Sequence, residues 1–449
     1  MTNRYPTERD PNSSRRRALQ LTAATVGTAV AGCLSWARSN DPSSGTTPDE
    51  NTSPVKTTDE TFDPEQYQIG SAFLDDRSSA GTVVPELNEE LEEWDAWAGA
   101  VSATTDEHAG HQDGALLLET DETQTEAIAR WTFAEPHNFE DRSISIAVKW
   151  EEPTDAYYQV ALTLRDESGD ALELTQYVET LTLEGWHRYD LGVNAIEGEP
   201  DLSAIVTVDV MTWVDDVTSQ VYVGDIRTTE TATGSYVLLH FDDLFEGAYT
   251  NAFPILEGYG FKATGATTIG AIGADNYMSQ DQISDLADHG WEFCSHPHAA
   301  ESFAEMKPST LDQLLAEYKA WHTDHGFDDG LDYIIYPYGE INDENLEVVS
   351  RYHKLGFKVP RAEYGTNITS PLLCGRATAE NREEVKAAID RATVYNTVVP
   401  IMFHDVGESE DWISQAGFEE TIEYIDDADG IEVITTSEWL SLIGGDVNE

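Results

Sequence analysis

Hydrophobic residues recur at every second position through much of the first half of the chain, from about Tyr67 to Thr229. Two of the clearest runs are Ile144, Ile146, Val148, Trp150 and Tyr158, Val160, Leu162, Leu164. A period of two is typical of β-strands that bury one face, and turn-forming residues such as those at 166–170 separate the runs. The pattern predicts an antiparallel β-sandwich over residues 67–230.

From Ser235 the pattern changes to short apolar runs, each followed by an amphipathic segment. Strands are expected at Val237–Leu239, Phe261–Thr264, Glu292–Ser295, Tyr333–Tyr336, Lys358–Val359 and Val398–Phe403. Helices are expected at Ala248–Tyr259, Leu311–Asp324, Asp343–Leu355, Arg382–Ala392 and Phe418–Ile425, with capping boxes at Ser279–Gln282 and Thr435–Glu438 opening two more. This alternation predicts a multidomain protein whose second part, residues 235–443, is an α/β distorted (β/α) barrel with a parallel sheet.

The first 66 residues read as export and tethering segments. Ser14–Leu19 resembles a twin-arginine signal, and Val30–Cys33 resembles a lipobox whose Cys33 would be lipidated after cleavage. A transmembrane anchor is the alternative, but the apolar run between these motifs is shorter than the roughly 20 residues that span a bilayer. We expect a signal peptide at 1–33, a disordered linker at 34–66, and a protein lipid-anchored on the outer face of the cell membrane.

The chain is strongly acidic, with 85 Asp and Glu against 25 Lys and Arg and a formal charge of −60. Phosphate neutralisation needs clustered Lys and Arg, so the charge argues against nucleic acid as a partner. The acidic residues are dispersed along the chain, which favours a general adaptation to concentrated salt over an acidic binding tail. A halophilic source is therefore expected.

Three stretches of the first half resemble jelly-roll carbohydrate-binding modules: Phe73–Asp76, Gly185–Leu191 and Val221–Ile226. Trp side chains on such a domain can stack on sugar rings, and Trp94 and Trp97 are the candidates. The alternative is that both simply fill the core of the sandwich. The resemblance implies a carbohydrate-binding-like domain at residues 67–230.

In the second half, polar residues of the types that bind metals or transfer protons follow the expected strands. Asp242 and Asp243 follow the first of these strands. The candidates that follow later strands are His296, His298, Tyr338 and His404. Adjacent carboxylates repel each other unless a cation lies between them and other ligands. Two His and one Asp form a well-attested set for a catalytic Zn²⁺ or similar divalent ion, and a second Asp could then act as a base. The carboxyl ends of parallel strands meet at one edge, which predicts a single site.

These elements resemble the polysaccharide deacetylase family (carbohydrate esterase family four), in which His240–Asp243 stands at the first signature. The resemblance implies a metal-dependent hydrolase that removes N- or O-acetyl groups from a polysaccharide. It implies that Asp242 is the general base, His404 the general acid, and the backbone N–H of Tyr338 a donor to the oxyanion. Asp243 and His296 would bind the metal, with Zn²⁺ as the expected ion.

The sequence departs from the family at two positions that bear on the site. The second metal His is expected four residues after His296, where Ala300 stands, and His298 is the candidate replacement. The Arg that orients the base is replaced by Ile335, and Arg376 is the candidate from another strand. These departures leave an alternative open, a catalytically impaired glycan-binding protein at the cell surface.

Overall fold

The structure is a computed structural model that describes residues 63–104, 114–121, 123–152, 157–179, 182–213, 218–231, 234–297, 302–358, 364–365, 367–407 and 412–445. The expected signal peptide with Cys33, the linker up to residue 62, and His298 lie outside the described residues. Among the described helices, none combines the length and the apolar character needed to cross a bilayer.

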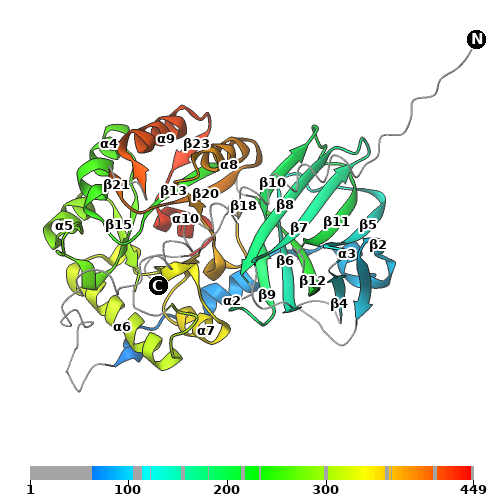
Figure 1. The fold of residues 1–449 in the computed structure, drawn as a ribbon, viewed down its shortest axis with the longest axis horizontal. Coiled ribbons are helices and arrows are strands. Elements are labelled where there is room, and N and C mark those ends of the chain that lie inside the picture. Colours follow the sequence, from blue (N-terminus) through cyan, green and yellow to red (C-terminus); the bar gives the residue numbers. More distant parts are fainter. Residues whose placement is uncertain are drawn as a thin grey trace, which may run out of the picture. The chain divides into compact units, whose positions relative to one another are not determined.

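The antiparallel part of the chain forms two six-stranded sheets (Figure 1). One sheet contains β1 (Thr82–Val83), β3 (Ala100–Thr104), β4 (Ala115–Thr120), β6 (Arg142–Glu152), β9 (His187–Asp190) and β12 (Ser219–Glu230). The other has the order β10 (Gly192–Glu197), β8 (Ala171–Glu179), β7 (Tyr157–Asp166), β11 (Ile205–Trp213), β5 (Glu126–His137) and β2 (Asp95–Ala98). The expected alternation is present, since Ile144, Ile146 and Val148 are each no more than 1% exposed.

The stretch Phe73–Asp76, one of the three that resemble carbohydrate-binding modules, lies in helix α2 (Ala72–Ser79). The segment before it, η1 (Pro64–Tyr67), leads to Ile69, whose N–H donates to the carbonyl of Arg351 at 2.7 Å. Phe73 packs against a core cluster that includes Leu440. These residues therefore associate with the second half of the chain, and the antiparallel strands begin only at Thr82. Short helical turns α3 (Pro85–Glu89) and η2 (Leu91–Glu93) follow.

The second half is built on a mostly parallel sheet with β13 (Ser235–Phe241) near its centre. The strand order is β17 (Leu355–Phe357), β16 (Tyr333–Ile335), β15 (Glu292–Ser295), β14 (Thr264–Thr267), β13, β20 (Thr397–Phe403) and β18 (Tyr364–Gly365). Two more strands pair off this path, β19 (Ala377–Thr378) with β20 and β23 (Ile431–Val433) with β13. A small parallel pair consists of β21 (Val406–Gly407) and β22 (Ile413–Ser414).

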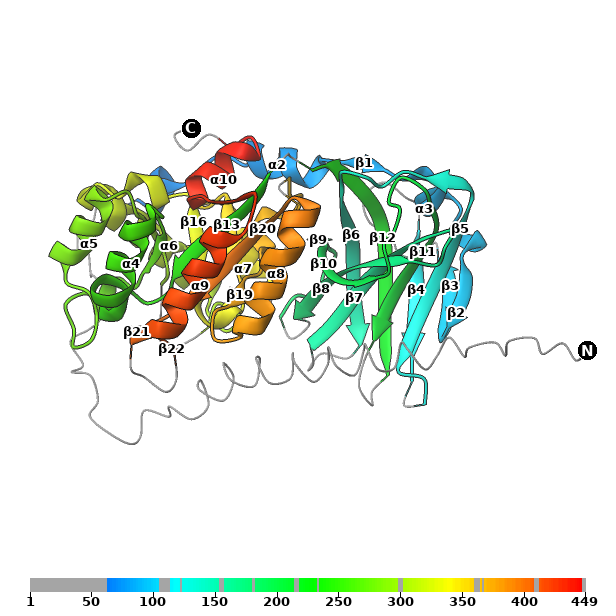
Figure 2. The same cartoon turned by 90° about the horizontal axis from the view of Figure 1, so that it is seen from above.

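Helices surround the strands of this half (Figure 2). They are α4 (Phe253–Tyr259), α5 (Gln280–Asp288), α6 (Pro308–His325), α7 (Asp343–Ser350), α8 (Arg382–Tyr395), α9 (Gln415–Asp427) and α10 (Thr436–Leu442). Short turns are η3 (Ala248–Ala252, a π-helix), η4 (Ile269–Ala271), η5 (Asp328–Gly330), η6 (Pro337–Gly339) and η7 (Pro371–Leu373). Both predicted capping boxes are confirmed, at Ser279 for α5 and at Thr435 for α10.

Two predicted strands are displaced along the chain. The strand expected at Phe261–Thr264 runs from Thr264 to Thr267, because Phe261 belongs to the end of α4, where its N–H donates to the carbonyl of Leu256. The left-handed Gly260 (φ 75°) precedes it, as in a helix C-cap with an apolar contact. The strand expected at Lys358–Val359 runs instead from Leu355 to Phe357.

Candidate active site

The predicted site residues lie directly after neighbouring parallel strands. Phe241 at the end of β13 is in register with Phe403 at the end of β20. Asp242 and His404 therefore occupy neighbouring positions directly after these two strands. His296 follows β15, which is separated from β13 by β14 alone. The carboxyl edge of the sheet thus collects the acid pair and two imidazoles, as expected for chemistry in this class of fold.

Asp242 is held by Arg376 in a bidentate ion pair. Arg376 Nη1 donates to Asp242 Oδ1 at 2.7 Å and Nη2 donates to Oδ2 at 2.8 Å. The side chains are only 1% and 4% exposed. Arg376 lies just before β19, so the arginine that holds Asp242 comes from a later segment of the chain, the candidate named from the sequence in place of Ile335.

The ion pair fixes the protonation state of Asp242. Burial by itself would raise the pKa of this carboxyl, but the charge and hydrogen bonds of Arg376 outweigh burial and hold the pKa well below its usual range. His296 and His404 lower it further. The lowered pKa favours the ionised form of Asp242, and a carboxylate with a low pKa is a weak base.

Asp243 is presented by a sharp turn with two consecutive left-handed residues, Asp243 (φ 65°) and Leu244 (φ 59°). Left-handed backbone is costly for residues with a Cβ, by about 1–2 kcal/mol each. The turn is held from below by packing, because Leu244 is 2% exposed and a Cβ on Gly265 would lie 2.8 Å from Leu244 Cδ2. Strain of this kind persists only where surrounding structure imposes it, and it is typical of functional sites.

His296 points one ring nitrogen at Asp243 and anchors the other. Nδ1 lies 2.9 Å from the carbonyl oxygen of Ile335, so it donates its N–H there, and Nε2 lies 3.4 Å from Asp243 Oδ1. Thr268 Oγ1 donates to the carbonyl of His296 at 3.2 Å and lies 3.5 Å from Asp243 Oδ1. Burial would lower the pKa of His296, but the hydrogen bond and charge of Asp243 raise it.

Asp243 and His296 have the chemistry of metal ligands. A backbone carbonyl on the far nitrogen is the usual second partner of a metal-binding His, because it leaves the other nitrogen free to coordinate. Within the described ranges no group of three His, Cys, Asp or Glu could hold a metal, and the expected third ligand, His298, lies outside them.

His404 lies against an aromatic side chain that the sequence did not single out. The rings of His404 and Trp412 are stacked, with centroids 4.1 Å apart and an angle of 21° between the planes. Burial lowers the pKa of His404, while the charges of Asp242 and Asp243 oppose that effect. Trp412 could have been noticed as the large aromatic residue that follows the polar stretch at 407–411.

Tyr338 sits at the mouth of the site in a left-handed conformation (φ 60°) and is 43% exposed. Burial and then the charge of Asp243 raise the pKa of its phenol, which places the ring within electrostatic reach of that carboxylate. Two further aromatic rings lie near the first loop, Phe245 and Tyr277, stacked at 4.9 Å. Phe245 is also 6.4 Å from Trp412, so an aromatic wall borders the acid pair.

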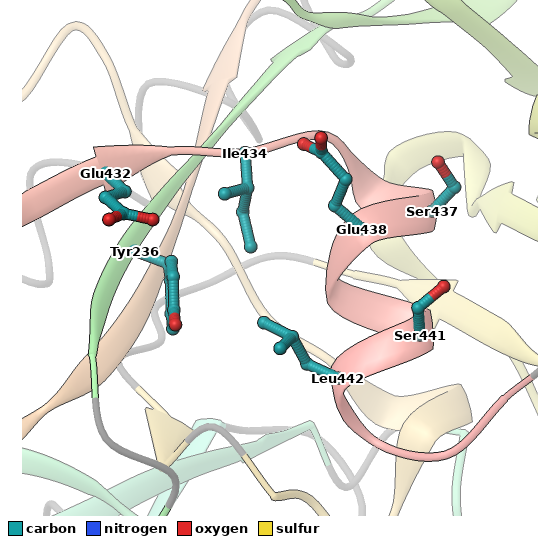
Figure 3. A pocket seen from close by; sticks show the side chains of 7 residues that line it. All are labelled: Tyr236, Glu432, Ile434, Ser437, Glu438, Ser441 and Leu442. Carbon is teal, nitrogen blue, oxygen red and sulfur yellow. The ribbon is translucent and has the colours of Figure 1, made fainter.

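A separate surface pocket lies at the other end of the same sheet. Its volume is about 380 Å³ and it is lined by Tyr236, Glu432, Ile434, Ser437, Glu438, Ser441 and Leu442 (Figure 3). Tyr236 is the second residue of β13, whereas Asp242 follows the last residue of that strand. The pocket is therefore distinct from the candidate active site.

The barrel half matches a known family in sequence. Residues 229–359 match the sequence model of the polysaccharide deacetylase family. The poly-beta-1,6-N-acetyl-D-glucosamine N-deacetylase of Staphylococcus aureus is 33% identical over 138 residues, which is 27% of this chain and 47% of that protein. The chain thus spans about half the length of the curated relatives it matches.

Solved structures give more distant matches. A Streptococcus pyogenes deacetylase in complex with acetate is 25% identical, with a TM-score of 0.28 over 31% of this chain and 62% of that chain. A family 4 acetyl xylan esterase from Clostridium thermocellum, solved with a cobalt ion, is 19% identical, with a TM-score of 0.34 over 47% and 93%. Residues 229–359 are therefore similar in sequence to polysaccharide deacetylases.

Proposed function

We propose that this protein is a metal-dependent hydrolase that removes acetyl groups from a polysaccharide, with an N-acetyl sugar as the substrate unit. The observation that carries the proposal is the ionised Asp242, clamped by Arg376, beside the Asp243–His296 pair. The amide is favoured over an ester because the relatives from Staphylococcus aureus are named as N-deacetylases.

The proposed reaction has two proton transfers, one to Asp242 and one from His404. Asp243 and His296, with His298 as the proposed third ligand, would hold a divalent ion, with Zn²⁺ as the expected ion, and such an ion would supply Lewis-acid chemistry toward a carbonyl oxygen and toward water. Asp242 takes the proton from that water as its oxygen bonds to the carbonyl carbon. The C–N bond then breaks, and His404 gives a proton to the departing amine, so that acetate and a free amino sugar leave.

Three other groups are proposed to assist. The backbone N–H of Tyr338 is assigned to the oxyanion that develops on the carbonyl oxygen, a role in which a fixed donor is most effective. Arg376 holds Asp242 in one orientation and keeps it ionised through its two hydrogen bonds. Trp412 supports the ring of His404 by stacking.

The proposal is tested by acetate release from N-acetylated and O-acetylated glycans, measured with purified protein in concentrated salt. Asp242→Asn keeps the shape of the side chain but removes the base, so acetate release should stop while the melting temperature changes little. No acetate from any of these glycans, with a stoichiometric divalent ion bound, would refute the hydrolase and favour the glycan-binding alternative.

We also propose that the mature protein is exported and anchored on the outer face of the membrane through lipid on Cys33. The support is the twin-arginine and lipobox-like motifs at Ser14–Leu19 and Val30–Cys33. The substrate would then be a cell-surface or extracellular polysaccharide. Cys33→Ser should release the protein from the membrane fraction, and an unchanged membrane fraction would contradict the anchor.

A further inference from the structure

Strand β9 of the antiparallel half ends in a buried carboxylate that holds part of the second half. Asp190 is 7% exposed and accepts four hydrogen bonds from two consecutive residues, Thr369 and Ser370. The amide nitrogen of Thr369 lies 2.9 Å from both carboxylate oxygens, and its Oγ1 lies 2.9 Å from Oδ1. The amide nitrogen of Ser370 lies 2.8 Å from Oδ2. A buried polar group whose hydrogen bonds are made is held rigidly, so this contact fixes the backbone at 369–370.

Residues 369–376, which we call the Arg376 segment, lead from this contact through a buried turn to Arg376. The turn is η7, and the N–H of Leu373 closes it by donating to the carbonyl of Ser370 at 3.1 Å. All three residues of η7 are buried. Protein interiors are packed about as closely as crystals of small organic molecules. A displacement at one end of such a turn is therefore passed on to the other end.

The second half of the chain holds the middle of the Arg376 segment. Tyr336, which follows β16, donates through Oη to the carbonyl of Leu372 at 2.8 Å. The N–H of Cys374 donates to the carbonyl of Gly356 in β17 at 3.0 Å. The segment is therefore held at its start by the antiparallel half and further along by strands of the second half, and it ends at the arginine that contacts Asp242.

The guanidinium of Arg376 depends on this segment for its position. Nη1 and Nη2 donate to Asp242, and the side chain of Arg376 is 1% exposed. Nε has no hydrogen-bond partner among the described residues. Apart from packing, the guanidinium is thus placed by Asp242 at one end and by the backbone of the Arg376 segment at the other. Hydrogen bonds weaken steeply as their geometry worsens, so a small shift of that backbone would weaken both bonds to Asp242.

The same strand makes a second contact with the second half, away from the Arg376 segment. His187, at the start of β9, lies with Nε2 2.6 Å from Oδ1 of Asp343, the first residue of α7. Oδ2 of Asp343 also accepts from the N–H groups of Glu184 and Gly185, at 3.1 and 3.0 Å. The two ends of β9 thus contact the second half at different places, and Asp190 is the end that contacts the Arg376 segment.

We propose that Asp190 is a positioning residue for the proposed base. By fixing the backbone at 369–370 it places Arg376, which orients Asp242 through two hydrogen bonds. The inference rests on the proposed function, because the role at stake is that of Asp242 as a base. The antiparallel half thereby supports the active site directly, a role that needs no bound ligand.

The first test needs no activity and measures the free energy of unfolding by urea denaturation in a double-mutant cycle. Thr369→Val keeps the shape of the side chain and removes the hydrogen bond from Oγ1 to Asp190. Combined with Arg376→Met, it should destabilise by less than the sum of the two single changes, since a displaced segment has no contact with Asp242 left to weaken. His187→Gln combined with Arg376→Met is the matched control and should be additive. An additive Thr369 cycle overturns the proposal.

The second test measures kcat/KM against pH for Asp190→Asn and Thr369→Val. A displaced Arg376 holds the pKa of Asp242 down less strongly, so the acid limb should move to higher pH. Misplacement of the base should also lower kcat by roughly 10-fold and leave KM for short acetylated oligosaccharides nearly unchanged. His187→Gln should change neither the acid limb nor kcat.

A general loss of stability lowers the amount of folded enzyme but leaves the midpoint of the acid limb in place. An unmoved acid limb in the active variants therefore contradicts the proposal, as does an equal shift in the His187 variant. Melting curves show whether the Asp190 variant folds, and Thr369→Val carries the test if it does not. If the unaltered protein releases no acetate, the proposed function fails, and the double-mutant cycle still decides whether Asp190 positions Arg376.

Discussion

Arg376 and Asp242 form a fully buried, bidentate ion pair between residues 134 positions apart in the chain, with N–O distances of 2.7 and 2.8 Å. The pair joins the loop after β13 to the segment that leads into β19. Since Asp242 is the proposed base, this contact sets both the position of the carboxylate and its charge.

Replacing Arg376 by Met should impair both stability and activity. Removing one partner leaves an unpaired buried charge, which costs about 3–5 kcal/mol in typical proteins. The pKa of Asp242 should rise, because burial, which Arg376 now outweighs, would then dominate. Urea unfolding measures the first effect, and the acid limb of kcat/KM against pH, which should move to higher pH, measures the second.

Arg382→Gln is the control for Arg376, because it breaks an ion pair with Glu420 in which the carboxylate is 61% exposed. Exposed pairs contribute little, so this variant should lose less than about 1 kcal/mol. If the Arg376 variant were as stable and as active as the Arg382 variant, the assignment of Asp242 as a clamped base would be wrong.

Removal of metal should abolish acetate release, and Zn²⁺ or Co²⁺ should restore it. Asp243→Asn and His296→Gln should each reduce bound metal below one ion per chain, measured by elemental analysis. Bound metal should also raise the melting temperature of the unaltered protein, since a ligand that binds only the folded state stabilises it.

Asp275→Asn is the matched control for the metal experiment, because Asp275 is an exposed carboxylate in the loop before α5. It should bind metal normally. Full metal content in the Asp243 and His296 variants would show that the ion, if present, is held elsewhere.

Trp412→Leu should lower kcat while leaving KM for short acetylated oligosaccharides nearly unchanged. Aromatic stacking contributes about 0.5–1.5 kcal/mol, so a loss of roughly 2- to 10-fold is expected if the stack positions His404. The basic limb of the pH profile should shift as well, because Trp412 contributes to the burial of the imidazole.

Trp321→Leu provides the comparison for Trp412, since Trp321 stacks on His325 with centroids 4.3 Å apart in α6, away from the acid pair. It removes a similar contact without touching the site. Equal kinetic losses in the two variants would indicate a general effect on stability and not a role at His404.

Acidification should destabilise the fold through buried histidines. Burial lowers the pKa of His322 to about 4 from 6.5, and that of His240 to about 3. Below pH 6.5 these histidines are protonated in the unfolded chain but stay neutral in the folded chain. The free energy of unfolding therefore falls as the pH drops toward their folded-state pKa values. For His322 the loss between pH 7 and 4 is about 3 kcal/mol at 1.36 kcal/mol per pKa unit.

His322→Gln should therefore flatten the decline in unfolding free energy between pH 6.5 and 4, measured by urea denaturation at constant high salt. His289→Gln is the contrast, because the pKa of this exposed imidazole is raised by a hydrogen bond to the carbonyl of Asp285. That group stabilises the fold at low pH, so its removal should leave the decline unchanged or steeper. An unaltered slope in the His322 variant would contradict the prediction.

Local chemistry made much of the second half predictable. The strand at Glu292–Ser295 and both capping boxes agree with the structure. A capping box is predictable because its hydrogen bonds form within four consecutive residues. Placement of Asp242, His296 and His404 at one edge followed from their positions directly after expected parallel strands. The strand displaced to Thr264 shows the limit, since the apolar Phe261 serves the helix end and not the sheet.

Long-range partners could not be read from the chain. Arg376 was named as a candidate, but nothing in the sequence fixes its two hydrogen bonds to Asp242, which depend on how β19 packs beside β20. The stack of Trp412 on His404 likewise depends on side-chain packing. Trp94 and Trp97 illustrate the point, because residues three positions apart end at 7% and 55% exposure.

The contact between Leu244 and Gly265 has a consequence for how this chain can vary. Glycine at 244 would relax the backbone there but empty the space that supports the turn, while any side chain at 265 would collide with Leu244 and with Phe293. A side chain at position 265 is therefore expected only together with a smaller residue at 244 and a change at Phe293. Packing between a loop and the strand beneath it thus limits which residues can occur together at positions 244 and 265.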